Sequence, residues 1–308
     1  RAWRFAGASA AVIIAGTALA WWAWPARAPV TGPAITVAAV QGNITQEIKW
    51  TQPALALAVS RYTSMTRELA STHPQFVLWP ETVITTNLAA DPQLQARFAT
   101  LARSLHTALA VGSVSVTDAD RNILAFYAGD TQTYYAKHQL VPFAESLPGP
   151  PWMRALPFAS LVSNFVSGTG DPVVHVDGLA VAPLICWESA FTDLAHAGAI
   201  RGAQFYAVAT DDAWFGASDG PYAHAQLTTL RAVETGRWIV RAAATGISGI
   251  VGPDGRWRER TPLGVQTTIS GTLGPPQPTF YAWLGPGPLG IAFLLAAAAG
   301  LALGGRRA

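Results

Sequence analysis

The stretch 181–188 reads VAPLICWE and places the chain's single cysteine, Cys186, at the end of an apolar, strand-like run. Two other strand-like runs end in a polar side chain: Glu81 follows 76–80 (FVLWP), and Lys137 follows 134–136 (YYA). In α/β sheets, functional sites assemble at strand ends. A cysteine nucleophile needs a base to take its proton and a cation to stabilise charge, which a glutamate and a lysine supply. The three residues are therefore candidate catalytic groups.

Each of the three residues also has an ordinary structural interpretation. A lone cysteine in an apolar strand behaves as a small buried hydrophobe. Lys137 would suit a solvated hairpin, and Glu81 would suit the first turn of a helix. The spacing by itself leaves these alternatives open. The chain has no C-x-x-C or H-x-x-x-H pair and no glycine-rich phosphate loop, so we predict neither a metal nor a cofactor.

Around these runs, strand-like and helix-like segments alternate, which predicts an α/β domain with a mixed sheet, arranged as sheets covered by helices. Two hairpins are predicted about Gly129 and Gly178. The predicted strands are 35–40, 76–79, 108–116, 123–128, 131–138, 173–176, 179–186, 205–210, 247–251 and 265–270. The predicted helices are a segment starting at Pro53, then 94–106, 191–203 and 222–241.

Composition points to a membrane protein. Charged residues make up 12% of the 308 residues, against about 25% in typical soluble domains, and the mean hydropathy is +0.26. Segments 5–24 and 284–303 are apolar and are predicted transmembrane helices flanking a domain at 33–275. Arginines outside both segments place that domain on the extracytoplasmic face. The alternative for 5–24 is a signal peptide, because A-R-A follows at 26–28.

The charge balance argues against nucleic acid as a partner. The formal net charge is +2, and the basic residues form no run within the central domain.

Three ordered motifs carry a resemblance to a known family. They are WPE at 79–81, YAKH at 135–138 followed by VPFAE at 141–145, and ICWE at 185–188. Together they resemble the nitrilase superfamily, whose members use a Glu-Lys-Cys triad on an αββα sandwich. The resemblance implies an α/β, nitrilase-like αββα sandwich here, flanked by the transmembrane helices, with Glu81, Lys137 and Cys186 as the triad.

More narrowly, the chain resembles the apolipoprotein N-acyltransferases, the membrane branch of that superfamily. Further matching segments are VQGN at 40–43 with Trp50, DAWFG at 212–216, RA at 231–232 and TGIS at 245–248. Members of this branch carry several more membrane helices upstream, so we expect the chain to be a fragment. Ala144, Trp187 and Asp211 depart from the usual Gly, Tyr and Asn, which puts the donor or acceptor preference in question.

This resemblance implies a two-step acyl transfer at the bacterial inner membrane, on the periplasmic face. Glu81 would deprotonate Cys186, which takes an acyl chain from a phospholipid as a thioester. The α-amine of a diacylglyceryl-cysteine lipoprotein would then accept the chain. Lys137 and the backbone N–H of Trp187 would hold the oxyanion. Glu145 would orient Lys137 or the amine, and Glu188 would gate the pocket.

Exposed-looking aromatics are expected to shield the thioester from water. Trp214 and Phe215 lie in the irregular stretch 212–221, whereas Trp50, in a matching segment, is a candidate substrate-binding or supporting residue. A second irregular stretch, 146–171, carries Trp152 and Phe158. These loops either touch lipid or pack over the core.

Two other functions compete with the acyltransferase. One is a membrane-anchored nitrilase-type amidase, or a nitrilase-like protein of a conjugal-transfer system, with water as the acceptor. The other is a non-catalytic membrane scaffold.

Overall fold

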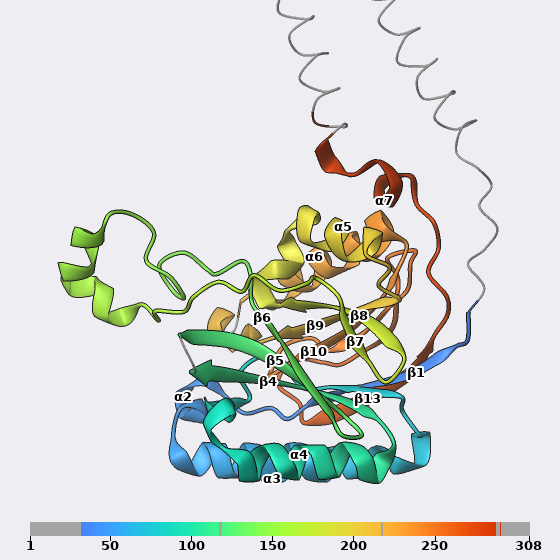
Figure 1. The fold of residues 1–308 in the computed structure, drawn as a ribbon, viewed down its shortest axis with the longest axis horizontal. Coiled ribbons are helices and arrows are strands. Elements are labelled where there is room, and N and C mark those ends of the chain that lie inside the picture. Colours follow the sequence, from blue (N-terminus) through green and yellow to red (C-terminus); the bar gives the residue numbers. More distant parts are fainter. Residues whose placement is uncertain (1–31, 117–118, 217, 288–289, 291–308) are drawn as a thin grey trace, which may run out of the picture.

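The protein is an αββα sandwich in a computed structural model that describes residues 32–116, 119–216, 218–287 and 290 (Figure 1). The first sheet has the strand order β13-β1-β2-β4-β5-β6, and β3 pairs with β4. Its strands are β1 (Ile35–Gln41), β2 (Phe76–Leu78), β3 (Ile84–Asn87), β4 (Ala108–Val116), β5 (Asp120–Ala128), β6 (Thr131–Ala136) and β13 (Thr267–Leu273).

The second sheet has the order β12-β11-β10-β9-β8-β7. Its strands are β7 (Val174–Val176), β8 (Leu179–Ile185), β9 (Phe205–Thr210), β10 (Trp238–Ala243), β11 (Gly249–Val251) and β12 (Trp257–Arg260). Strands β1, β2 and β4 run parallel in the first sheet, and β8, β9 and β10 run parallel in the second. Parallel strands bring their carboxyl ends to one edge, which is where the candidate site lies.

Helices cover the outer face of each sheet (Figure 1). The first sheet carries α3 (Gln52–Glu68) and α4 (Pro92–Leu105), and the second carries α5 (Thr192–Ile200) and α6 (Gly220–Thr235). Two short helices complete the set. Helix α2 (Gln46–Lys49) lies near the site, and α7 (Phe280–Leu284) lies near the end of the described chain. Side chains on the two faces of each sheet therefore enter different apolar layers: one lies between the sheets, and one lies under each pair of helices.

The predicted helix 222–241 is wrong at its C-terminal end. Helix α6 stops at Thr235, and Gly236 adopts a φ of +65° while its N–H donates to the carbonyl of Ala232. Glycine takes this left-handed conformation without a Cβ clash and so ends the helix. The apolar residues beyond it form the buried strand β10 instead. Strands β3 and β12 were also not predicted, since both are short and carry little periodicity.

The membrane predictions concern residues that the structure mostly leaves undescribed. Segment 5–24 lies outside the described residues, as does 284–303 apart from 284–287 and 290. Within the part of the chain that is described, we find no helix that is both long and apolar enough to span a bilayer.

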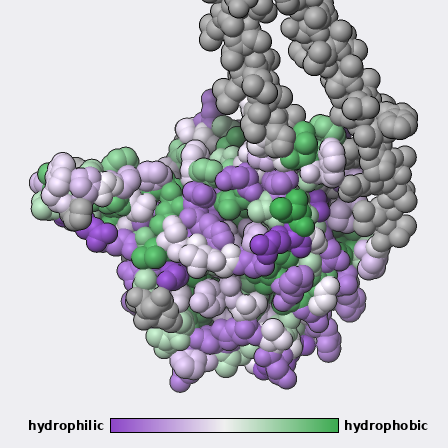
Figure 2. Space-filling model, turned by 45° about the horizontal axis from the view of Figure 1, so that its top comes forward, coloured by the Kyte–Doolittle hydropathy of each residue, from purple (hydrophilic) through white to green (hydrophobic). Residues whose placement is uncertain are grey.

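The irregular stretch 146–171 projects from the sandwich (Figure 1). It contains two short 3-10 helices, Pro151–Ala155 and Pro157–Leu161. Trp152 is 65% exposed, so it does not pack over the core. Figure 2 shows hydrophobic residues on this projection and in patches on the adjoining body, interspersed with polar ones.

Candidate active site

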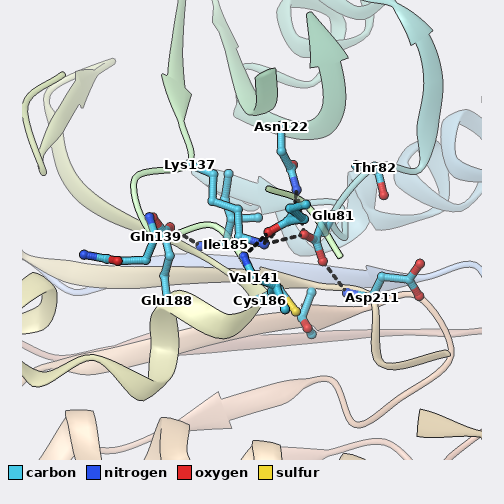
Figure 3. A network of polar contacts seen from close by, with 12 residues as sticks. Glu81, Thr82, Asn122, Lys137, Gln139, Val141, Ile185, Cys186, Glu188 and Asp211 are labelled. Carbon is cyan, nitrogen blue, oxygen red and sulfur yellow. Dashed lines mark hydrogen bonds and ion pairs between the residues drawn. The ribbon is translucent and has the colours of Figure 1, made fainter. Parts of the chain in front are cut away.

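The three candidate catalytic side chains meet between the two sheets (Figure 3). Glu81 lies just beyond β2, and Lys137 directly follows β6 in the same sheet. Cys186 directly follows β8 of the opposite sheet. The Nζ atom of Lys137 lies 3.1 Å from Oε1 of Glu81. Residues separated by more than 100 positions, from 81 to 186, therefore share one site because the sheets stack face to face.

The backbone of Cys186 is held in an unusual conformation. Its φ is +51°, in the left-handed region that non-glycine residues occupy at a cost of about 1–3 kcal/mol. The cysteine begins a 3-10 turn, Cys186–Ala190. Its carbonyl accepts a hydrogen bond from Oγ of Ser189 at 2.8 Å and lies 3.1 Å from Nε2 of His224. These contacts fix the turn that presents the Cys186 thiol to the site.

Glu81 is held as a carboxylate. Its Oε1 accepts from Nδ2 of Asn122 at 2.7 Å, and its Oε2 accepts from the backbone N–H of Asp211 at 2.9 Å. Burial alone would raise the pKa of Glu81, but the ammonium groups of Lys137 and Lys49 and the hydrogen bond from Asn122 outweigh it. The net pKa lies below the ordinary value of 4.5.

The other two groups hold the complementary protons. Burial would lower the pKa of Lys137, but the negative charges of Glu81, Cys186 and Glu145 raise it above its ordinary value. Burial, together with the Glu81 carboxylate, raises the pKa of the Cys186 thiol. The site therefore pairs a neutral thiol with a carboxylate and an ammonium group, which is the starting state for general-base activation of a nucleophile.

Glu145 lies against Lys137. Its carboxylate oxygens are 2.9 Å (Oε1) and 2.8 Å (Oε2) from Nζ of Lys137. Oε1 also accepts from Asn122 at 3.0 Å, and Oε2 accepts from the N–H of Val141 at 2.9 Å. Of the two roles considered for Glu145, this geometry favours the orientation of Lys137.

Glu188 is not placed as a gate. Its side chain is fully buried, with an exposed fraction of 0%. Oε1 accepts from the hydroxyl of Tyr135 and from the N–H groups of His138 and Gln139, at 3.0, 2.6 and 3.1 Å. Oε2 accepts from the N–H of Ile185 at 2.7 Å. Glu188 thus ties the turn after β8 to the segment after β6, and a side chain held by four hydrogen bonds is not free to open and close.

The supporting aromatic side chains lie next to site residues in sequence and are exposed. Trp50 follows Lys49 and is 53% exposed, and Trp187 follows Cys186. Trp214 and Phe215 belong to the 3-10 turn Asp212–Phe215 beyond β9. Trp214 is 69% exposed, so packing over the core does not account for it. The side chain of Phe158 lies outside what the structure describes.

A second buried network lies behind the nucleophile and was not predicted. Asp212 accepts from Nη2 of Arg241 at 2.8 Å (Oδ2), and its Oδ1 lies 2.8 Å from Nδ1 of His224. Burial would raise the pKa of Asp212, but Arg241 and His224 hold it at about 2. Because His224 also contacts the carbonyl of Cys186, this network supports the nucleophile turn. Its sequence signal was a charged residue, Arg241, inside an apolar run.

Two further unpredicted residues lie at the site. Asn122 bridges Glu81 and Glu145 from within β5, and Lys49 reaches the site from the end of α2. Asn122 follows Asp120 and Arg121 at the polar start of β5, so its local sequence does not set it apart. Nothing local distinguishes Lys49 from an exposed lysine.

The sandwich of two helix-covered sheets, with a thiol, a carboxylate and an ammonium group between them, defines a nitrilase-type protein. The model of the carbon-nitrogen hydrolase family matches residues 36–275. The chain belongs to the carbon-nitrogen hydrolase family.

Curated proteins resemble the chain in sequence. The apolipoprotein N-acyltransferase of Azotobacter vinelandii is 33% identical over 270 residues, which cover 85% of this chain and 51% of that protein. The apolipoprotein N-acyltransferase of Geobacter metallireducens is 34% identical over 260 residues, 80% of this chain and 49% of that protein. The chain thus spans about half the length of these curated relatives.

A solved structure confirms the nitrilase-like fold. The amidase from Nesterenkonia sp. AN1, in a form showing Michael addition of acrylamide at its active-site cysteine, superposes with a TM-score of 0.59 at 20% identity. The match covers 84% of this chain and 99% of the amidase. At this identity the likeness concerns the fold alone.

Proposed function

We propose that the chain carries the catalytic domain of an apolipoprotein N-acyltransferase, spanning residues 33–275. The observation that carries the proposal is the Cys186 thiol beside the ion pair of the Glu81 carboxylate and the buried Lys137 ammonium group. The similarity to curated apolipoprotein N-acyltransferases selects acyl transfer from among the reactions that such a site performs. The proposed donor is a phospholipid, and the proposed acceptor is a diacylglyceryl-lipoprotein.

In the first step, Glu81 takes the thiol proton while Sγ of Cys186 attacks the ester carbonyl of the phospholipid. The C–S bond forms, and the negative oxygen is held by Nζ of Lys137 and the backbone N–H of Trp187. One such donor is commonly worth about 10²–10³ in rate. The ester C–O bond then breaks, and Glu81 returns its proton to the departing lysophospholipid oxygen.

In the second step, the α-amine of the lipoprotein's N-terminal cysteine attacks the thioester carbonyl. Glu81 takes a proton from the attacking nitrogen, an amide bond forms and the C–S bond breaks. The proton passes from Glu81 to the sulfur, which regenerates the thiol. The thioester must survive until the amine arrives, so water has to be kept from the site.

The exposed aromatics suit this demand. Trp214 and Phe215 extend from the turn next to Asp211, whose N–H holds Glu81. A lipid-facing site also fits our proposal that the domain lies on the periplasmic face of the bacterial inner membrane, held by segments 5–24 and 284–303. Both substrates would then reach Cys186 from the bilayer.

Replacement of Trp214 or Phe215 by alanine should slow acylation by phospholipid far more than it lowers the melting temperature. Trp214 is 69% exposed, so its removal leaves little cavity, whereas Phe215 is 40% exposed and its ring packs on His224, so its removal should cost somewhat more stability. Mass spectrometry of samples quenched at successive times measures the acylation rate, and thermal melts measure the melting temperature. A loss of activity that simply tracks a loss of melting temperature would count against a lipid-contacting role.

Intact mass spectrometry tests the function directly. The protein in detergent is incubated with a defined phospholipid beside Cys186→Ala, which removes the nucleophile but little volume. We expect an acyl adduct, released by hydroxylamine, on the wild type alone, and its transfer to a diacylglyceryl-cysteine peptide. If small amides are hydrolysed and no adduct forms, the amidase alternative replaces this proposal. If neither reaction occurs with this chain or with a protein that carries this domain at the full length of its relatives, the scaffold alternative replaces it.

A further inference from the structure

A second buried lysine lies beside the candidate base. Lys49, at the end of α2, is only 4% exposed. Its Nζ donates to Oγ1 of Thr82 at 2.6 Å and to the backbone carbonyl of Glu81 at 3.2 Å. It also forms an ion pair with Oδ2 of Asp211 at 2.5 Å. The three contacts of the Lys49 ammonium group are therefore with Glu81 itself, with its neighbour Thr82 and with Asp211, which contacts Glu81.

Asp211, the partner of Lys49, contacts the other end of Glu81. Asp211 is 2% exposed, and its backbone N–H donates to the Glu81 carboxylate. Its Oδ1 accepts from the N–H of Ala213, at the start of the turn that carries Trp214. One ion pair thus links α2, the backbone and carboxylate of Glu81, and the aromatic turn after β9. Figure 3 shows Asp211 beside the Glu81 carboxylate.

The pair also balances charge around the base. Lys49 is a cation that favours the carboxylate form of Glu81, and it lowers the pKa of that group. Asp211 is an anion at the same place and opposes this effect. In a buried setting such charges act strongly because little water screens them. Removing either partner alone would therefore leave a net charge beside Glu81, with opposite signs in the two cases.

We propose that the buried Lys49–Asp211 ion pair is a positioning device for the acylation step, which holds Glu81 against the nucleophile and balances the charge around it. The proposal rests on the role of Glu81 as the base in the proposed function. Neither residue touches the reacting atoms in this assignment. Both act through Glu81.

Other charged and polar groups also face Glu81. They are Lys137 from the end of β6, Glu145 through Lys137, Cys186 from the opposite sheet and Asn122 from β5. All four stay unchanged when only the pair is altered. A difference between variants of the pair therefore reports on the pair itself.

The test is the pH dependence of Cys186 acylation in the wild type, Lys49→Met, Asp211→Asn and the double variant. An activated p-nitrophenyl ester serves as the acyl donor, and a phospholipid is run in parallel. The burst rate falls on the acid side as Glu81 becomes protonated. We expect this acid limb to lie below pH 4.5 in the wild type.

The single variants should move the acid limb in opposite directions. Lys49→Met leaves an anion beside Glu81 and should raise the limb by about one pH unit, whereas Asp211→Asn leaves a cation and should lower it by about one. The double variant should lie between the two. If all four proteins lose activity at the same acid pH and differ only in rate, the pair has a structural role alone and the proposal is overturned.

Folding is followed separately, since a buried charge without its partner is destabilising. The double variant removes both charges, so it should fold even if Lys49→Met does not. In that case the comparison is between the double variant and Asp211→Asn, and the acid limb of the double variant must lie at the higher pH. Arg201→Met breaks the exposed Arg201–Asp171 pair and is the matched control, with no shift expected. A shift seen with the ester but no adduct from phospholipid would sustain this inference and refute the proposed donor.

Discussion

Glu81→Gln is expected to slow acylation of Cys186 by about 10²–10⁴-fold, the usual contribution of a positioned general base. Glutamine keeps the shape of the side chain, but its single amide oxygen can accept from only one of the two donors, Asn122 or the backbone N–H of Asp211, because its NH2 group is itself a donor. It cannot take the thiol proton. Lys137 keeps Glu145 as an ionic partner, so the fold should survive. The burst rate with an activated ester measures the effect.

Glu68→Gln is the matched control for this prediction. Glu68 is exposed near the end of α3 and accepts only from the hydroxyl of Ser64 among the contacts described for it. Its substitution should leave the burst rate unchanged. A Glu81→Gln variant that acylates within a few-fold of wild type would show that another group takes the proton.

Arg241→Met is expected to lower the free energy of unfolding by about 3–5 kcal/mol, the usual cost of breaking a buried ion pair from one side. Arg241 is fully buried in β10 and donates to Asp212, to Oγ1 of Thr228 and to the carbonyl of Ile247. Methionine fills much of the volume but leaves the Asp212 carboxylate without its main counter-charge. Urea denaturation at neutral pH measures the loss.

Arg258→Met provides the comparison, because Arg258 forms an exposed ion pair with Asp254. That variant should change stability by no more than about 1 kcal/mol. Both variants break an Arg–Asp pair, which is buried for Arg241 and exposed for Arg258, whose guanidinium also lies 5.5 Å from the centroid of the Trp238 ring. Equal effects would mean that burial of the Arg241–Asp212 pair carries no special weight in this fold.

The cost of Arg241→Met should also shrink in acid. The pKa of Asp212 in the folded protein is about 2, below its ordinary value of 3.8. A depressed carboxyl pKa contributes stability that is present above about pH 3.8 and is lost as the pH falls through about 2. The difference between wild type and Arg241→Met should therefore narrow over that range.

The sequence by itself determined the layered α/β fold and the strand ends at which Glu81, Lys137 and Cys186 lie. Apolar periodicity within a strand or helix is a local property, and it reports which face each segment buries. The polar residues that interrupt those runs stood out for the same reason. The wrong part of the prediction, the continuation of a helix through Gly236 to 241, came where one glycine outweighed an otherwise apolar run.

Only the tertiary structure decided how the site is supported. Lys49 and Asp211 are 162 positions apart, and nothing in the sequence indicates that the two residues pair. Glu188 changed from a candidate gate to a buried acceptor of four hydrogen bonds once the segment after β6 was placed beside it. Such pairings depend on how two sheets stack and which loops meet between them. Local sequence does not indicate these pairings, because the burial of a side chain and the choice of its partner depend on the tertiary structure.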